Sequence, residues 1–183
     1  SILERPGAKD VCIEFFSLSK SFDVTGARMS FLIGRPDVVA AFRKMRSQID
    51  FGVFLPIQKA AIAALTGPTD MVEQQCRDYQ ARRDALCAGL RAIGWDVPDS
   101  KGSMFVWAPV PPAYHDAYVA AHGSDEGLSM AFCLDLIERA GVITTPGGSF
   151  GPLGEGYTRF ALVLPPEKIK EAVRSIADSG ILK

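Results

Sequence analysis

The sequence predicts an α/β protein, because short apolar runs rich in β-branched and aromatic residues alternate along the chain with longer segments of helical periodicity. The expected strands cover residues 11–17, 28–34, 104–108, 142–145 and 157–164. The expected helices cover residues 37–49, 56–65, 69–93 and 125–140, followed by a final helix with apolar residues between Ile169 and Ala177. Two connections are long, a proline-rich loop after residue 108 and a glycine-rich loop over residues 146–156, and long loops are where function concentrates.

The longest helix is expected over residues 69–93. Thr69 is suited to cap its N-terminus and Gly94 to end it, and apolar residues recur every three or four positions between them. Arg83 lies in register with this apolar stripe. The favoured interpretation is an arginine that lies along the surface with its aliphatic stem packed, while a buried carboxylate partner or a ligand remains an alternative.

The charge balance argues against several classes of partner. The formal net charge of −1 over 183 residues gives no reason to expect binding to nucleic acid or to an anionic membrane. No apolar run is long enough to span a bilayer, and residues 1–10 lack the basic and apolar regions of a signal peptide. We therefore expect a cytoplasmic protein.

The cysteines and histidines predict no metal site. The cysteines match neither a zinc pattern nor a CxxC redox pair, and each lies in an apolar or amphipathic segment, so we expect buried and reduced thiols. They are Cys12, Cys76, Cys87 and Cys133. The only histidines, His115 and His122, have no partner at metal-ligand or catalytic-triad spacing, so we expect both at the surface.

The first candidate for chemistry is Lys20, which follows a strand expected to be buried, in a loop that also holds Ser17 and Ser19. Burial lowers the pKa of a lysine, and a deprotonated amine can form an imine with an aldehyde. Arg28 follows in the chain, and its planar guanidinium suits a phosphate group. These residues together suit a phosphorylated aldehyde, although lysines and serines also fill loops for solubility alone.

The second candidate is Arg159, which interrupts the apolar strand after the glycine-rich loop. An unpaired charge inside such a strand is costly, so the side chain is expected to face a cleft or an acidic partner. A clamp on a substrate carboxylate and an internal salt bridge explain it equally well. The glycine-rich loop precedes a strand, whereas phosphate-binding glycine loops open a helix, which argues against a P-loop.

The segment from Glu14 to Arg28 resembles the Schiff-base segment of class I/II pyridoxal-phosphate-dependent aminotransferases. Further similar segments follow in the family's order and extend over essentially the whole chain. They lie at residues 52–58, 79–84, 105–109, 146–151 and 157–164. The Lys20 segment is most similar to the branch of LL-diaminopimelate, alanine and aspartate aminotransferases.

The resemblance implies a fold-type I architecture and a role for each candidate residue. Lys20 would hold pyridoxal 5'-phosphate covalently and later carry the transferred proton, while Ser17 and Arg28 would bind the cofactor phosphate with support from Ser19. Arg159 would bind the α-carboxylate of the substrate. The implied partners are an amino acid, a 2-oxo acid and a second copy of the chain in a homodimer.

The resemblance also implies a domain division and an incomplete site. Residues 1–78 correspond to the C-terminal part of the large cofactor domain and residues 79–183 to the small domain, with helix 69–93 crossing the junction. The family's chains are much longer, and the aspartate that pairs with the cofactor ring would precede Ser1. We therefore expect a fragment that is inactive in isolation.

Two departures from the family and two alternative functions remain open. Ala27 stands where the family often has an aromatic residue, and Met29-Ser30 where it has an aliphatic–glycine pair, so packing beside Arg28 is expected to differ. The same fold also serves amino-acid lyases and synthases, and aminotransferase-like domains serve as effector-sensing parts of transcription regulators. A 2-oxo acid acceptor would distinguish the first alternative, and a DNA-binding domain upstream of Ser1 the second.

Overall fold

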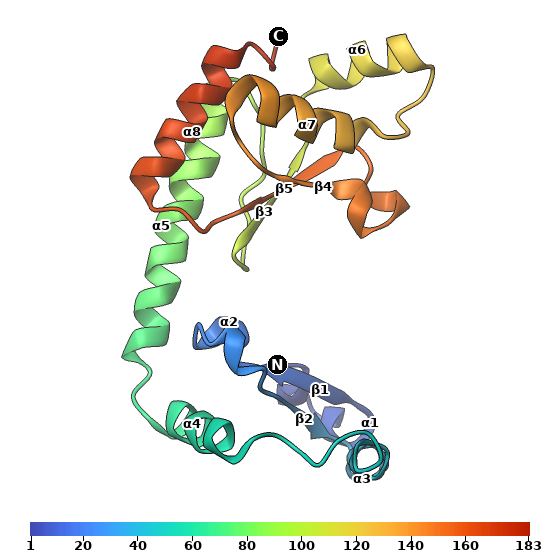
Figure 1. Ribbon diagram of the computed structural model, residues 1–183, viewed down its shortest axis with the longest axis vertical. Helices are drawn as coiled ribbons and strands as arrows, with labels where there is room; N and C mark the ends of the chain where they lie inside the picture. Colours follow the sequence, from blue (N-terminus) through green and yellow to red (C-terminus); the bar gives the residue numbers. More distant parts are fainter. The chain divides into compact units, whose positions relative to one another are not determined.

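The computed structural model describes residues 1–183, and these fall into two compact units, Ser1–Gln74 and Gln75–Lys183 (Figure 1). Helix α5 (Asp70–Ala92) carries the chain from the first unit into the second. It matches the helix expected over residues 69–93, and Gly94 ends it with a positive φ of 91° as expected. No helix of the chain combines the length and the apolar character that a membrane crossing requires.

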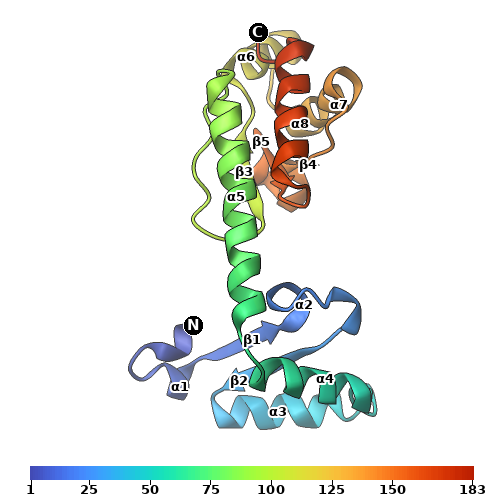
Figure 2. The same cartoon turned by 90° about the vertical axis from the view of Figure 1, so that its left-hand side faces the viewer.

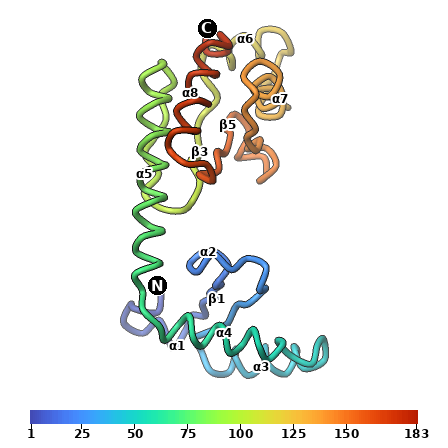
Figure 3. Tube along the Cα trace, turned by 60° about the vertical axis from the view of Figure 1, so that its left-hand side comes forward, coloured from blue at the N-terminus to red at the C-terminus, as the bar shows by residue number.

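The first unit is built on an antiparallel hairpin of β1 (Ile13–Ser17) and β2 (Ser30–Gly34). Its register pairs Ile13 with Gly34 at one end and Ser17 with Ser30 at the other. Short helical turns precede and connect the strands, and two longer helices follow them, drawn from blue to teal in Figure 3. These elements are η1 (Ile2–Glu4), α1 (Ala8–Val11), α2 (Leu18–Ser21), η2 (Thr25–Ala27), α3 (Pro36–Arg46) and α4 (Leu55–Thr66).

The expectation of a buried first strand is wrong for this chain, because exposed and half-buried residues alternate along β1. Phe15 is 63% exposed although its ring meets that of Phe42 on α3 edge-on at 6.0 Å, and Phe16 stacks on Phe31 at 5.2 Å. In a two-stranded sheet each strand has a single partner, so few neighbours remove its side chains from water. The first unit consequently has a small buried apolar set, which is Ala8, Leu18 and Ala61.

The second unit contains a three-stranded antiparallel sheet in the order β3-β5-β4. Its strands are β3 (Phe105–Pro109), β5 (Tyr157–Ala161) and β4 (Thr145–Pro146), and its helices are α6 (Pro112–His122), α7 (Leu128–Ala140) and α8 (Pro166–Ser179). The C-terminal part of α5 runs beside α8 (Figure 2), where a Cβ added to Gly89 would lie 3.1 Å from Val173. The glycine therefore permits close packing of these two helices.

The core of the second unit lies behind one face of this sheet. Trp95 is its largest buried side chain and meets Phe132 and Phe160 edge-on, with ring centroids 5.3 and 5.5 Å apart. The indole N–H of Trp95 donates a 2.8 Å hydrogen bond to the carbonyl of Pro109, so its polar group is satisfied. Because side chains alternate along a strand, the residues between the core-facing ones point to the opposite face, where Arg159 lies.

Helix α6 corrects the expectation of a long proline-rich loop after residue 108. Pro112 stands at the first position of the helix, where its missing N–H and fixed φ are tolerated, so this proline starts the helix. His115 and His122 lie on α6 with exposed surface, as expected. The strand expected over residues 142–145 is shorter and forms at Thr145–Pro146.

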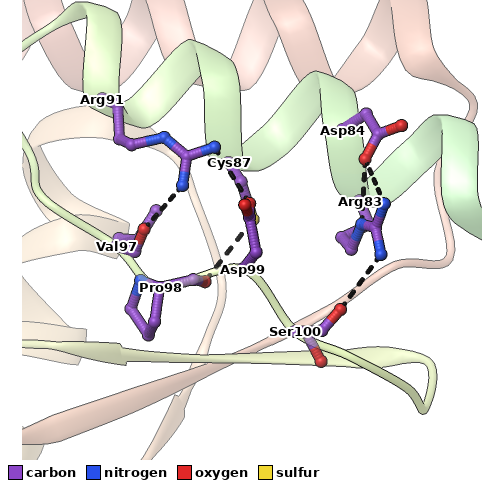
Figure 4. A network of polar contacts seen from close by, with 8 residues as sticks. All are labelled: Arg83, Asp84, Cys87, Arg91, Val97, Pro98, Asp99 and Ser100. Carbon is purple, nitrogen blue, oxygen red and sulfur yellow. Dashed lines mark hydrogen bonds and ion pairs between the residues drawn. The ribbon is translucent and has the colours of Figure 1, made fainter.

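Two arginines fasten the segment after α5 to the helix (Figure 4). Arg91 donates to the carbonyl of Val97 and to the carboxylate of Asp99, both at 2.9 Å. Arg83 donates to Asp84 at 2.6 Å and to the carbonyl of Ser100 at 3.2 Å. Arg83 therefore has the structural role that the sequence favours, with an exposed carboxylate partner.

The expectation of buried thiols is correct for Cys87 and Cys133 and wrong for Cys76, which is exposed on α5. The core of the second unit contacts α5 only from Tyr79 onwards, so Cys76 lies ahead of the packed part of the helix. Cys12 is partly buried. Burial raises the pKa of the Cys87 thiol, which keeps that group protonated.

Candidate functional site

The connection between β1 and β2 carries the lysine candidate. Ser17 ends β1 and caps α2, because its Oγ accepts a 3.2 Å hydrogen bond from the N–H of Ser19. The N–H of Leu18 donates to the carbonyl of Met29 at 3.2 Å, and Leu18 is only 2% exposed. A buried leucine thus holds one turn of helix against the hairpin, where the sequence predicts a loop.

Lys20 lies in that helical turn with its side chain exposed. The burial that the sequence analysis expects for its amine is therefore not provided by the residues of the first unit. The cause is the same as for β1, since a two-stranded hairpin offers few neighbours to cover the connection.

Arg28 is joined to the lysine turn by a threonine. Its Nη1 donates to the carbonyl of Thr25 at 3.2 Å, and the hydroxyl of Thr25 donates to the carbonyl of Ser19 at 3.0 Å. Arg28 itself has a left-handed backbone, with φ 52° and ψ 44°, so β2 starts at Ser30 and not at Arg28 as expected. Thr25 is not among the residues that the sequence singles out, and its only sequence signal is a hydroxyl three residues before the arginine.

The structure therefore brings Ser17, Ser19, Lys20 and Arg28 onto one short connection. The cap uses a lone pair of the Ser17 hydroxyl, which leaves the O–H free to donate to an anion. The guanidinium of Arg28 is exposed and donates one hydrogen bond to the carbonyl of Thr25, so its remaining N–H groups are available to an anion. An amine, a hydroxyl donor and a guanidinium fit a phosphorylated aldehyde, which is the chemistry of pyridoxal phosphate.

Arg159 occupies the centre of β5, opposite Trp107 on β3 and Thr145 on β4. Its guanidinium carbon lies 4.1 Å from the centre of the Phe105 ring and 4.5 Å from that of Phe150. Its Nη2 donates a long 3.4 Å hydrogen bond to the hydroxyl of Thr145. These contacts are with rings and a hydroxyl, so the alternative of an internal salt bridge is not supported.

The Nε atom of Arg159 is buried and has no hydrogen-bond partner. A buried donor without an acceptor costs free energy, and native proteins keep few of them. The arginine therefore carries unused donor capacity, as expected for a residue whose partner is a ligand.

The aromatic residues around Arg159 form a continuous group on this face of the sheet. Trp107 stacks on Tyr157 with ring centroids 5.7 Å apart, and Phe150 meets Trp107 edge-on at 5.5 Å. Phe150 comes from η3 (Gly147–Phe150) in the glycine-rich loop, which continues through η4 (Pro152–Gly154). Phe150 is not among the residues that the sequence singles out, although its place inside the loop is a usable signal.

The glycine-rich loop is closed on itself at its base. A Cβ at Gly147 would overlap the carbonyl oxygen of Gly154, and a Cβ at Gly154 would overlap that of Gly147. These two glycines therefore allow two backbone segments to touch, a role unrelated to a phosphate-binding loop.

Comparison with solved structures defines the class of protein. The chain has the architecture of fold-type I pyridoxal-phosphate-dependent transferases, since aminotransferase structures superpose on nearly all of it. An aminotransferase from Staphylococcus aureus is 31% identical with a TM-score of 0.87, covering 100% of this chain and 46% of that one. Apo-BacF from Bacillus subtilis is 32% identical with a TM-score of 0.83, covering 97% and 44%.

The chain belongs to the aminotransferase class I and II family, whose sequence profile matches residues 4–176. The LL-diaminopimelate aminotransferase of Halothermothrix orenii is 41% identical over 181 residues, which is 99% of this chain and 43% of that protein. The glutamate-pyruvate aminotransferase AlaC of Escherichia coli is 42% identical over 176 residues, or 96% of this chain and 40% of that protein. The chain thus spans less than half the length of the curated relatives it matches.

Proposed function

We propose that the protein of which this chain is part transfers an amino group between an amino acid and a 2-oxo acid, with pyridoxal 5'-phosphate as cofactor. The proposal rests on the connection between β1 and β2, which presents the amine of Lys20, the hydroxyl of Ser17 and the guanidinium of Arg28. Membership of the aminotransferase family supports it. Similar relatives carry the names LL-diaminopimelate and glutamate-pyruvate aminotransferase, which favours an amino-acid substrate of that group.

The first unit would hold the cofactor. Lys20 Nζ would bind its aldehyde carbon, and the Ser17 hydroxyl and the Arg28 guanidinium would bind its phosphate, with Ser19 and Thr25 keeping Arg28 in place. When bound, pyridoxal phosphate supplies an electron sink that stabilises negative charge at the substrate Cα.

Lys20 would also move the proton. When its amine is not bonded to the cofactor, Lys20 Nζ would be a free base that could accept the proton from the substrate Cα and donate it again two atoms away, which is the 1,3-shift of a transamination. Water would then release the first 2-oxo acid, and the same steps in reverse with the second 2-oxo acid would complete the transfer of the amino group. The reaction needs no second basic side chain for this step.

Arg159 would bind the α-carboxylate of both substrates. A guanidinium offers two parallel N–H donors to a carboxylate, and the aromatic group around Arg159 keeps its faces covered. The buried Nε of Arg159 has no hydrogen-bond partner, which supports the proposal that a substrate carboxylate accepts from this side chain.

The remaining assignments concern the whole protein. Residues 1–78 would be the C-terminal part of the large cofactor domain and residues 79–183 the small domain, a boundary four residues beyond the end of the first unit at Gln74. The complete enzyme would act as a cytoplasmic homodimer. Many apolar side chains of the first unit are exposed. Exposed apolar surface of this kind supports the proposal that further parts of the protein cover the hairpin.

A direct test is an assay of the complete enzyme with an amino-acid donor, with and without a 2-oxo acid acceptor. An aminotransferase forms product only when the acceptor is present. A lyase of the same fold would release ammonia or a thiol without any acceptor, and that result would overturn the proposal.

A further inference from the structure

We propose that the glycine-rich loop Gly147–Gly154 is the positioning element of Arg159, with Phe150 as its contact residue and Glu155 as the anchor that fastens it to α7. This inference rests on the proposed role of Arg159 in binding substrate carboxylates. Phe150 and Glu155 are positioning residues, because they act on the substrate through the arginine.

The first step is the aromatic contact that holds the guanidinium. Phe105 and Phe150 lie over Arg159 at 4.1 and 4.5 Å from its central carbon, within the range of a cation–π interaction. The hydrogen bond to Thr145 is long at 3.4 Å, so it restrains the side chain weakly. The rings therefore do more than the hydroxyl to fix the arginine. Phe105 belongs to a strand, whereas Phe150 depends on its loop.

The second step is the bond that fixes the loop to α7. The N-cap of this helix is Gly127, which has a left-handed backbone and no side chain to accept the first N–H groups. Glu155 supplies the missing acceptor, since its Oε1 accepts a 2.5 Å hydrogen bond from the N–H of Ser129. A carboxylate at a helix N-terminus is also favoured by the helix dipole.

The third step links the other end of the loop to the same residue. The hydroxyl of Ser129, which is 1% exposed, accepts a 3.1 Å hydrogen bond from the N–H of Gly148. Gly147 and Gly154 touch at the base of the loop. Ser129 therefore binds both flanks of the loop, and Phe150 is carried between two fixed points.

The consequence is a selective effect on substrate binding. Loosening the loop removes one of two aromatic contacts from Arg159, so every substrate that presents a carboxylate should bind more weakly. The donor amino acid and the 2-oxo acid acceptor should be affected alike, because they share this group. Cofactor binding and kcat should change little, because the cofactor residues lie in the first unit.

The first experiment observes Arg159 directly in the 183-residue chain. Its Nε–Hε signal in the nitrogen–proton NMR spectrum is assigned by its loss in Arg159→Lys, and two stacked rings should shift it upfield. Phe150→Leu should move the signal downfield, and Phe150→Tyr, which keeps a ring, should leave it in place. Glu155→Ala should move it in the same direction, while Glu155→Gln, which keeps an accepting oxygen, should move it less.

The matched control is Glu126→Ala, an exposed carboxylate just before the same helix. It should leave the Arg159 signal unchanged. An unshifted signal in both Phe150→Leu and Glu155→Ala would overturn the proposal. The conservative variants guard against a general loss of folding, because they keep the ring and the acceptor.

The second experiment measures steady-state kinetics of the complete enzyme with glutamate and pyruvate. Phe150→Leu and Glu155→Ala should each raise both KM values by about tenfold with kcat nearly unchanged. If Arg159→Ala raises both KM values and the two loop variants do not, the loop inference fails while the proposed function survives. If Arg159→Ala itself leaves both KM values unchanged, the role of Arg159 in the proposed function fails.

Discussion

The hydroxyl of Tyr114 on α6 donates a 2.9 Å hydrogen bond to Oδ2 of Asp135 on α7. The tyrosine ring also meets Phe132 at 5.0 Å, which places it against the core. Burial, together with the hydrogen bond to a carboxylate, raises the pKa of Tyr114 well above its ordinary value. The hydrogen bond between these two helices therefore requires the un-ionised phenol of Tyr114.

We predict that the second unit loses stability as the pH rises above the ordinary tyrosine pKa of about 10. A phenol whose pKa is raised by folding ionises more readily in the unfolded chain, so its stabilising contribution is complete below that pH and declines above it. Tyr114→Phe should cost about 1 kcal/mol at neutral pH through the lost hydrogen bond. The substitution should also reduce the loss of stability at alkaline pH.

Urea unfolding of both proteins at neutral and alkaline pH measures this difference. Tyr79→Phe, at a half-buried tyrosine on α5, is the matched control and should retain the alkaline decline. An identical decline in Tyr114→Phe and the unaltered chain would show that Tyr114 does not contribute to it.

Lys20→Ala should abolish catalysis in the complete enzyme. Without this amine the cofactor loses its covalent attachment, so the visible absorbance of the lysine-bound form should vanish and turnover should fall by orders of magnitude. Lys9→Ala, at an exposed lysine on α1, should leave both unchanged. Near-normal transamination by Lys20→Ala would refute the assignment of Lys20.

Arg159→Ala should weaken binding of amino-acid and dicarboxylate substrates by roughly 2–4 kcal/mol, the range for removing one partner of a buried charge pair. The cofactor spectrum should stay unchanged, because the proposed phosphate ligands lie in the first unit. Substrate titrations monitored by absorbance measure both properties. Loss of cofactor together with unchanged substrate binding would mean that the roles of Arg159 and Arg28 are reversed.

Residues 1–183 expressed alone should bind pyridoxal phosphate weakly and show no transamination. Ser17, Lys20 and Arg28 are exposed in the first unit, so the water-excluding surroundings that make such groups effective are missing. Titration with the cofactor, followed by an assay with glutamate and a 2-oxo acid, tests this expectation. Stoichiometric binding with ordinary turnover would contradict it.

Local signals in the sequence predicted several elements well. Helix α5 lies within one residue of its expected bounds at each end, because its apolar stripe and Gly94 are local features. Helix α6 is not predicted, because the cluster of prolines before it indicates a loop, whereas Pro112 occupies the first helical position, which favours proline.

The candidate residues were partly predictable. The amine and the guanidiniums were indicated by residue type and by the family resemblance, but their surroundings were not. The left-handed backbone at Arg28 and the bond between Ser129 and Glu155 depend on contacts that no local pattern specifies. The exposure of Lys20 likewise follows from how few strands surround it, which cannot be read from the lysine segment alone.

The division of the chain at Gln74 has an optical consequence. Every tryptophan and tyrosine belongs to the second unit, and Ser1–Gln74 contains neither residue type. Fluorescence from the tryptophans therefore reports the second unit alone, and so does near-ultraviolet circular dichroism from these rings. Far-ultraviolet circular dichroism reports the backbone of both units. A difference in midpoint between the unfolding curve followed by tryptophan fluorescence and the one followed by far-ultraviolet dichroism would show that the two units unfold separately. The comparison needs neither a label nor a substitution.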